Sequence, residues 1–168
     1  EPNLTIRGTV FPGMIKRVSP QVEKYFGASV KIMVVSKADL YGGKICAALD
    51  RQHPRDLYDV KMLLDNEGFS EEVRKGFIVH LASHDETMSE LLQPKLKDIG
   101  AIYKSHFEGM TLERVSLEEL LETRKKLISL IHSSLTKHEF QFLLTLKRGE
   151  PQWELMDLLK IDKLPAIQ

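Results

Sequence analysis

The sequence is poor in the features that mark secreted, membrane-spanning and strongly charged proteins. A single cysteine, Cys46, cannot form a disulfide within the chain, which fits a reducing compartment. No window approaches the roughly 18 continuous apolar residues that a membrane span needs, and no signal peptide is evident. The 24 basic and 24 acidic residues cancel, so no overall charge attracts nucleic acid or an anionic membrane. We therefore expect a globular, cytoplasmic protein with no membrane partner.

Several motifs of catalysis and metal binding are absent as well. The chain has neither of the common glycine-rich phosphate loops and no nucleophile elbow. His80 and His84 lie four residues apart, as two metal ligands on one helical face can, but no glutamate follows His80 and no third ligand is evident. We interpret the two histidines as structural and expect no metal ligand in this chain.

The first part of the chain carries the pattern of β-strands. Residues 3–11 alternate apolar and polar positions, and residues 28–35 form a run rich in β-branched side chains, so both stretches are predicted as strands. Pro12-Gly13 ends the first of them. Two strands are too few to be stable alone, so we expect them to pair with further strands.

Helix-start signatures recur from Ser36 onward. Ser36, Thr87, Ser116 and Thr136 are each followed three residues later by Asp or Glu, and Ser70 precedes two first-turn glutamates. The predicted helices span residues 37–50, 54–67, 70–84, 88–107 with an interruption at Pro94, 116–135, 137–148 and 152–160. The predicted fold class is therefore α+β and mostly α, with short N-terminal strands followed by a helical bundle lobe.

The clearest of these helices, 116–135, is amphipathic. Its leucines and isoleucines recur at spacings of three and four, and Glu118, Glu122, Lys125 and Lys126 lie on the opposite face. This pattern indicates a bundle helix with a solvated back rather than a surface for nucleic acid.

Lys44 is the first candidate for chemistry. It lies four residues from both Leu40 and Ala48, so it is predicted to lie along the apolar side of its helix. Either its stem packs while the ammonium reaches water, or the charge points into a cleft that binds phosphate. Gly42 and Gly43 precede it, and each costs a helix about 1 kcal/mol relative to alanine. Two glycines here indicate close approach of a backbone or a ligand, which favours the functional interpretation.

Two aspartates follow in the stretch HPRDLYDV. Pro54 suits the first helical position, which places Asp56 in the first turn, where a carboxylate favours the helix dipole. Asp59 lies in the second turn beside the apolar stripe, where an unpaired charge is costly. We expect Asp59 to pair with Lys44 or Arg55, or to face a cleft.

The stretch KADLYGGKICAALDRQHPRDLYDVKMLL resembles the AbiEii/AbiGii toxin family of nucleotidyltransferases, from abortive-infection, type IV toxin–antitoxin systems. The resemblance rests on Lys44 in its Gly-Gly-Lys segment, on Asp50-Arg51, and on Arg55-Asp56 followed by Asp59. It implies that residues 1–35 are the C-terminal strands of a nucleotidyltransferase core and that residues 36–168 form a helical lobe.

The resemblance also implies a reaction, the transfer of a nucleotidyl group from a nucleoside triphosphate to an RNA or protein acceptor. Lys44, Asp56 and Asp59 would be the catalytic residues, and Lys44, Arg51 and Arg55 would bind the nucleotide. The family's Gly-Ser turn and its Asp-x-Asp pair for Mg²⁺ are not found in this sequence, and we expect them upstream. The chain alone is then expected to be inactive, and a cognate antitoxin is an expected partner.

Two other function classes stay open at this point. The chain could be a non-catalytic helical module that binds a protein, with Lys44 and Asp59 forming a structural salt bridge. It could also be a helical domain that binds nucleic acid, although zero net charge weakens that hypothesis. A Gly-Ser turn followed by Asp-x-Asp in the upstream reading frame would decide for the enzyme.

Overall fold

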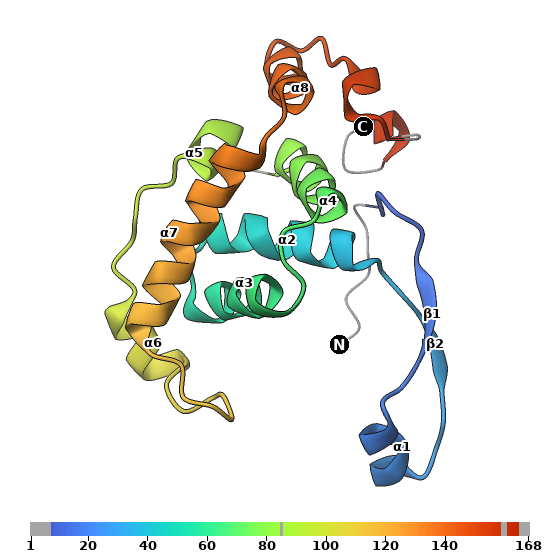
Figure 1. Ribbon diagram of the computed structural model, residues 1–168, viewed down its shortest axis with the longest axis vertical. Coiled ribbons are helices and arrows are strands. Elements are labelled where there is room, and N and C mark those ends of the chain that lie inside the picture. Colours follow the sequence, from blue (N-terminus) through green and yellow to red (C-terminus); the bar gives the residue numbers. More distant parts are fainter. Residues whose placement is uncertain (1–7, 85, 159–160, 165–168) are drawn as a thin grey trace.

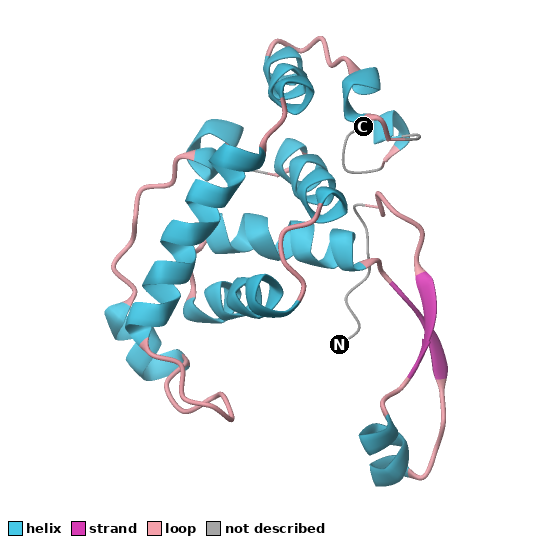
Figure 2. Cartoon of the chain, viewed as in Figure 1, coloured by secondary structure: helices cyan, strands magenta, loops and turns pink. Residues whose placement is uncertain are grey.

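The computed structural model describes residues 8–84, 86–158 and 161–164. Most of these residues are helical, and strands occur in a single hairpin near the start of the chain (Figure 2). The elements in chain order are β1 (Met14–Arg17), α1 (Pro20–Phe26), β2 (Lys31–Val34), α2 (Lys37–Asp50), α3 (Pro54–Asn66), α4 (Glu71–Ala82), α5 (Met88–Leu92), α6 (Gly100–His106), α7 (Leu117–Ser134), α8 (Lys137–Lys147) and the 3₁₀ helices η1 (Trp153–Met156) and η2 (Ile161–Lys163). The predicted class, mostly α with short N-terminal strands, is confirmed.

Residues 14–34 form an arm that projects from the helices (Figure 1). Strand β1 pairs antiparallel with β2, with Met14 opposite Val34, and α1 lies between them. The α1 helix starts where the Ser19 hydroxyl accepts a hydrogen bond from the Val22 amide at 3.4 Å, with proline at its first position. No residue of α1 is buried, and the apolar residues Ile15 and Met33 are 67% and 68% exposed. The arm therefore contributes little to the core.

The strand predictions are half confirmed. The predicted strand 28–35 is β2, but of the predicted strand 3–11 residues 3–7 lie outside the described residues, and residues 8–11 are not in a strand. The Val10 and Phe11 amides donate to the Asp39 carboxylate at 2.6 and 3.1 Å, so a side chain rather than a neighbouring strand satisfies them. Strand β1 instead begins beyond Pro12-Gly13, where no strand was predicted.

Helices α2 and α4 cross at close range because glycines meet at their contact. A Cβ added to Gly42 would lie 2.7 Å from the Gly76 carbonyl carbon, and one added to Gly76 would lie 2.5 Å from the Ala38 oxygen. A Cβ at Gly43 would only touch the His80 ring, at 3.6 Å. The predicted close approach is thus real at Gly42, where its cause is the backbone of α4. Around this crossing the core is fully buried, with Ile45, Leu57, Phe77 and Leu127 at 0% exposure.

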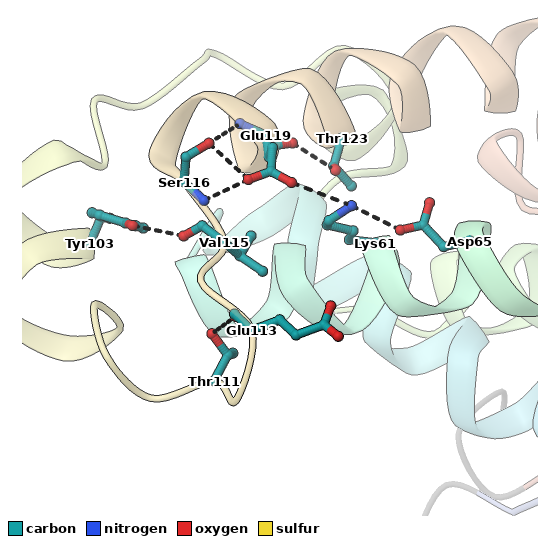
Figure 3. Close-up of polar contacts among 9 residues, drawn as sticks. All are labelled: Lys61, Asp65, Tyr103, Thr111, Glu113, Val115, Ser116, Glu119 and Thr123. Carbon is teal, nitrogen blue, oxygen red and sulfur yellow. Dashed lines mark hydrogen bonds and ion pairs between the residues drawn. The ribbon is translucent and has the colours of Figure 1, made fainter.

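Helix α7 lies against α3, and a lysine joins the two (Figure 3). Lys61 on α3 contacts Asp65 at 2.8 Å and Glu119 of α7 at 3.8 Å. Glu119 also completes a capping box. Its carboxylate accepts a hydrogen bond from the Ser116 amide at 2.7 Å, and its own amide donates to the Ser116 hydroxyl oxygen at 3.2 Å. The solvated back predicted for this helix is confirmed, since Glu118, Glu122, Lys125 and Lys126 are exposed.

Three predicted helices end earlier or divide. Helix α4 stops at Ala82 rather than at residue 84, and the predicted helix 88–107 is two short helices separated by residues 93–99. Pro94 has no amide to donate, and the Gln52 side chain binds the backbone of Lys95 and Lys97, which holds that stretch extended. In the predicted helix 152–160, η1 is a 3₁₀ turn that closes with Asp157 in the left-handed region at φ 48°, and residues 159–160 lie outside the described residues.

Candidate functional site

The Lys44 and Asp59 side chains meet between α2 and α3. Lys44 Nζ donates to Asp59 Oδ2 at 2.6 Å, and the two side chains are 40% and 36% exposed. Lys44 lies at the border of the buried side of α2 rather than on it, since Leu40, one turn earlier, is 47% exposed. The predicted pairing of Asp59 with Lys44 is confirmed, and the pair lies where a ligand from solvent can reach it.

Arg51 and Asp56 form a second pair at the start of α3. Arg51 Nη2 lies 2.7 Å from Asp56 Oδ1, with side chains 63% and 8% exposed. The other carboxylate oxygen, Oδ2, is buried with no hydrogen-bond partner among the described residues. Asp56 is therefore more than a first-turn carboxylate that favours the dipole, because it also fixes an exposed arginine at the surface.

Arg55 extends the row of charges along α3. It lies one turn before Asp59 and so shares its helical face, and its Nη2 approaches Met110 Sδ at 3.4 Å. No carboxylate of the described residues pairs with Arg55, so its charge is available to an anion. Lys44 thus reaches the Asp59 carboxylate from α2, while Arg55 adds a second positive charge one turn before Asp59 on α3.

A buried polar cluster fixes the turn that joins α2 to α3. Gln52, 1% exposed, adopts the left-handed region at φ 52°. Its Oε1 accepts from the Lys97 amide at 3.0 Å and from Arg124 Nη1 at 2.8 Å, and its Nε2 donates to the Lys95 carbonyl at 2.8 Å. Arg124 also donates to the Lys97 carbonyl at 2.8 Å. The cluster holds the helices of Lys44 and Asp59 at a fixed turn.

Sequence reasoning missed this cluster, although Arg124 left a signal. It lies four residues after Leu120 and three before Leu127, on the apolar stripe of α7, and it is 6% exposed. Burial lowers the pKa of Arg124. A charged residue in such a stripe is the pattern of a buried polar network. Gln52 carried no comparable signal, since a polar residue between two helices is ordinary.

The resolved pKa shifts of carboxylates and lysines lie away from the Lys44–Asp59 pair. The hydrogen bond between Lys61 and Asp65 raises the pKa of Lys61 above the ordinary lysine value. Hydrogen bonds from the Ser116 amide and hydroxyl hold the pKa of Glu119 below the ordinary glutamate value. These groups lie at the contact of α3 with α7.

A metal centre is not assembled by the described residues. They include no group of three or more His, Cys, Asp or Glu side chains that could hold an ion. His84 lies beyond the end of α4, where its Nδ1 accepts from the Glu86 amide at 3.2 Å, while the His80 ring packs beside Gly42 and Gly43. The residues shown here therefore do not fit Mg²⁺, and we assign no step to a metal.

This arrangement can hold a phosphate and orient a hydroxyl. Two cations, Lys44 and Arg55, can neutralise the negative charge of a phosphate, and the Asp59 carboxylate can accept a hydrogen bond from a hydroxyl group.

Among the described helices, none is long and apolar enough to cross a membrane.

One comparison with known proteins gives a match. The family model described as "Nucleotidyl transferase AbiEii toxin, Type IV TA system" matches residues 3–160. Neither the curated proteins nor the solved structures include a match. The matched span contains the pairs of Lys44 with Asp59 and of Arg51 with Asp56, as well as Arg55.

Proposed function

The chain belongs to the AbiEii family of nucleotidyl transferase toxins of type IV toxin–antitoxin systems, and from this membership we propose that it transfers a nucleotidyl group to an RNA or protein acceptor. The donor is a nucleoside triphosphate, an acceptor hydroxyl attacks its α-phosphorus, and pyrophosphate leaves. A cognate antitoxin is the proposed protein partner. The proposed setting is abortive infection in the bacterial cytoplasm.

The proposed roles follow from charge and position. Lys44 and Arg55 bind the triphosphate, and Arg51, which is held by Asp56, adds a third positive charge at the surface. Asp59 orients the Lys44 ammonium and accepts a hydrogen bond from the attacking hydroxyl. Stabilising the charge that develops on the phosphates is the largest contribution such groups make. In this family reading Mg²⁺ is the cofactor, with ligands outside the described residues.

We also propose that β1 and β2 belong to the sheet of a nucleotidyltransferase core, with residues 36–168 as its helical lobe. The bare faces of the arm support this, because Ile15 and Ile32 lie on opposite faces of the hairpin and are 67% and 49% exposed. A two-stranded ribbon that is apolar on both sides is not stable by itself. Further strands would pair with its edges, and elements packed on the enlarged sheet would cover its faces.

The single observation that carries the proposal is the exposed pair of Lys44 and Asp59 within the matched span. An ion pair this exposed contributes only about 0–1 kcal/mol to stability. Losing the pair therefore costs the fold little, and its exposure leaves both charges within reach of a ligand.

Lys44→Ala and Asp59→Ala should each abolish nucleotide transfer by the complete gene product, and any toxicity to a bacterial host, without changing the melting temperature appreciably. The transfer assay uses radiolabelled nucleoside triphosphates with Mg²⁺. Lys37 and Glu67 provide a matched control, because they too pair α2 with the end of α3 and have side chains 52% and 41% exposed. Lys37→Ala and Glu67→Ala should retain full transfer. Folded Lys44 and Asp59 variants with wild-type activity would refute the assignment.

A further inference from the structure

The loop from Glu108 to Arg114, called the 108–114 loop, is anchored at both ends. Phe107 before it and Val115 after it are 3% and 9% exposed, and the Tyr103 hydroxyl donates to the Val115 carbonyl at 2.7 Å (Figure 3). Arg114 and Glu108, the last and first residues of the loop, form an ion pair, with Arg114 Nη2 3.6 Å from Glu108 Oε1. The loop thus starts and ends in the core, and its middle is held out from the protein.

The tip of this loop is apolar and has its own hydrogen bonds. Gly109 turns the chain at φ 80°, the Met110 amide donates to the Phe107 carbonyl at 3.0 Å, and the Thr111 hydroxyl donates to the Glu113 carbonyl at 2.6 Å. Met110 is 60% exposed, and Leu112 is fully exposed. Two apolar side chains are therefore presented to solvent on an ordered turn.

The tip lies at the end of the charged row. Met110 Sδ is 3.4 Å from Arg55 Nη2, Arg55 shares a helical face with Asp59, and Asp59 binds Lys44. The positively charged side chains of α2 and α3 are thus followed by the apolar tip of the loop that connects α6 to α7. A nucleotide has groups that match this order, because its anionic phosphates suit the positive side chains and its ribose joins them to a flat ring with apolar faces, which suits the apolar tip.

We propose that Met110 and Leu112 contact the base of the nucleoside triphosphate whose phosphates Lys44 and Arg55 bind. This inference rests on the proposed function and adds the part of the site that holds the ring. The flexible, polarisable thioether of Met110 suits a flat aromatic surface, and its position beside Arg55 lets one ligand reach both. The 108–114 loop then governs affinity for the base and not for the phosphates.

The test compares two probes on the complete gene product. Affinities of ATP, GTP, CTP and UTP are measured by calorimetry, beside inorganic tripolyphosphate, which has the phosphates without a base. Met110→Ser and Leu112→Ser should each weaken the preferred nucleotide by about tenfold, the loss of one well-packed apolar contact, and leave tripolyphosphate binding unchanged. Arg55→Ala should weaken both probes. Leu144→Ser on α8, where the side chain is 40% exposed, is the control and should change neither.

Each other outcome is decisive. Loop variants that bind nucleotides as the wild type does would overturn the inference and leave the proposed function intact. An equal loss for tripolyphosphate would overturn it as well, because the loop would then act only through Arg55. A wild-type protein that binds neither nucleotide nor tripolyphosphate would refute the proposed function, and the base site with it. Melting temperatures should not change, since both side chains lie outside the core.

Discussion

Two residues in the described part of the chain combine a side chain with a left-handed backbone, and their surroundings differ completely. Gln52, at φ 52°, is 1% exposed and binds three partners, whereas the Asp157 side chain, at φ 48°, is 98% exposed. A left-handed non-glycine residue costs roughly 1–2 kcal/mol. Glycine removes this cost at either position, so the balance depends on what each side chain contributes.

Gln52→Gly should lower the free energy of unfolding by about 2 kcal/mol. Leaving the buried Arg124 guanidinium and the Lys95 carbonyl short of partners costs about 1–3 kcal/mol for each group, which exceeds the strain that is relieved. Asp157→Gly should be neutral or stabilising by up to about 1 kcal/mol, because only a distant contact with Lys75 is lost. Urea denaturation measures both changes. A stabilised Gln52→Gly would show that the buried cluster contributes less than its backbone strain.

Among single residues, the sequence predicted the Lys44–Asp59 pair better than it predicted the buried cluster that fixes the turn between their helices. Lys44 and Asp59 could be paired because helical spacing puts each beside its buried stripe, and one helix follows the other closely. The left-handed turn at Gln52 could not be predicted, because it depends on partners 43 to 72 residues away in the chain. Asp39 was predicted as part of a capping box, yet its carboxylate also binds the amides of Val10 and Phe11.

At the level of elements, the start of α7 should respond to acid. Hydrogen bonds with Ser116 place the folded-state pKa of Glu119 below its unfolded value, which is about 4.3. The stabilisation is therefore complete above that pH and is lost as pH falls through the folded-state pKa. The melting temperature of Glu119→Gln should be below that of the wild type at pH 7, and the difference should shrink toward pH 3. Glu122→Gln, on the exposed face, should show no such convergence.

The helices could be predicted because their start signals are local. Ser36, Ser70, Thr87, Ser116 and Thr136 all cap helices as expected. Helix α1 was not predicted, although Ser19-Pro20 carries an N-cap and a first-position proline. The sequence predicted the division of helix 88–107 only in part. Pro94 explains why the helix breaks, but the length of the extended stretch after it depends on the contacts of Gln52 with the backbone of Lys95 and Lys97.

At the level of the whole molecule, the arm should exchange its amide hydrogens much faster than the helices. Its two strands have bare faces, no residue of α1 is buried, and a lone two-stranded ribbon is marginally stable. Hydrogen–deuterium exchange of this chain should therefore label β1, α1 and β2 before α2 and α4, whose shared core opens rarely. Protection of β1 and β2 equal to that of α2 would show that another surface covers the arm in solution.

The chain's only cysteine lies at the contact of α2 with α4, and this gives the molecule a built-in reporter. Cys46 is 2% exposed, and its Sγ lies 3.9 Å from the Phe77 carbonyl. A thiol reagent can reach it only when the two helices separate, so its labelling rate measures how often that interface opens. Because the sequence contains no second thiol, the signal comes from one place, and nucleotide or partner binding can be followed through it without any substitution.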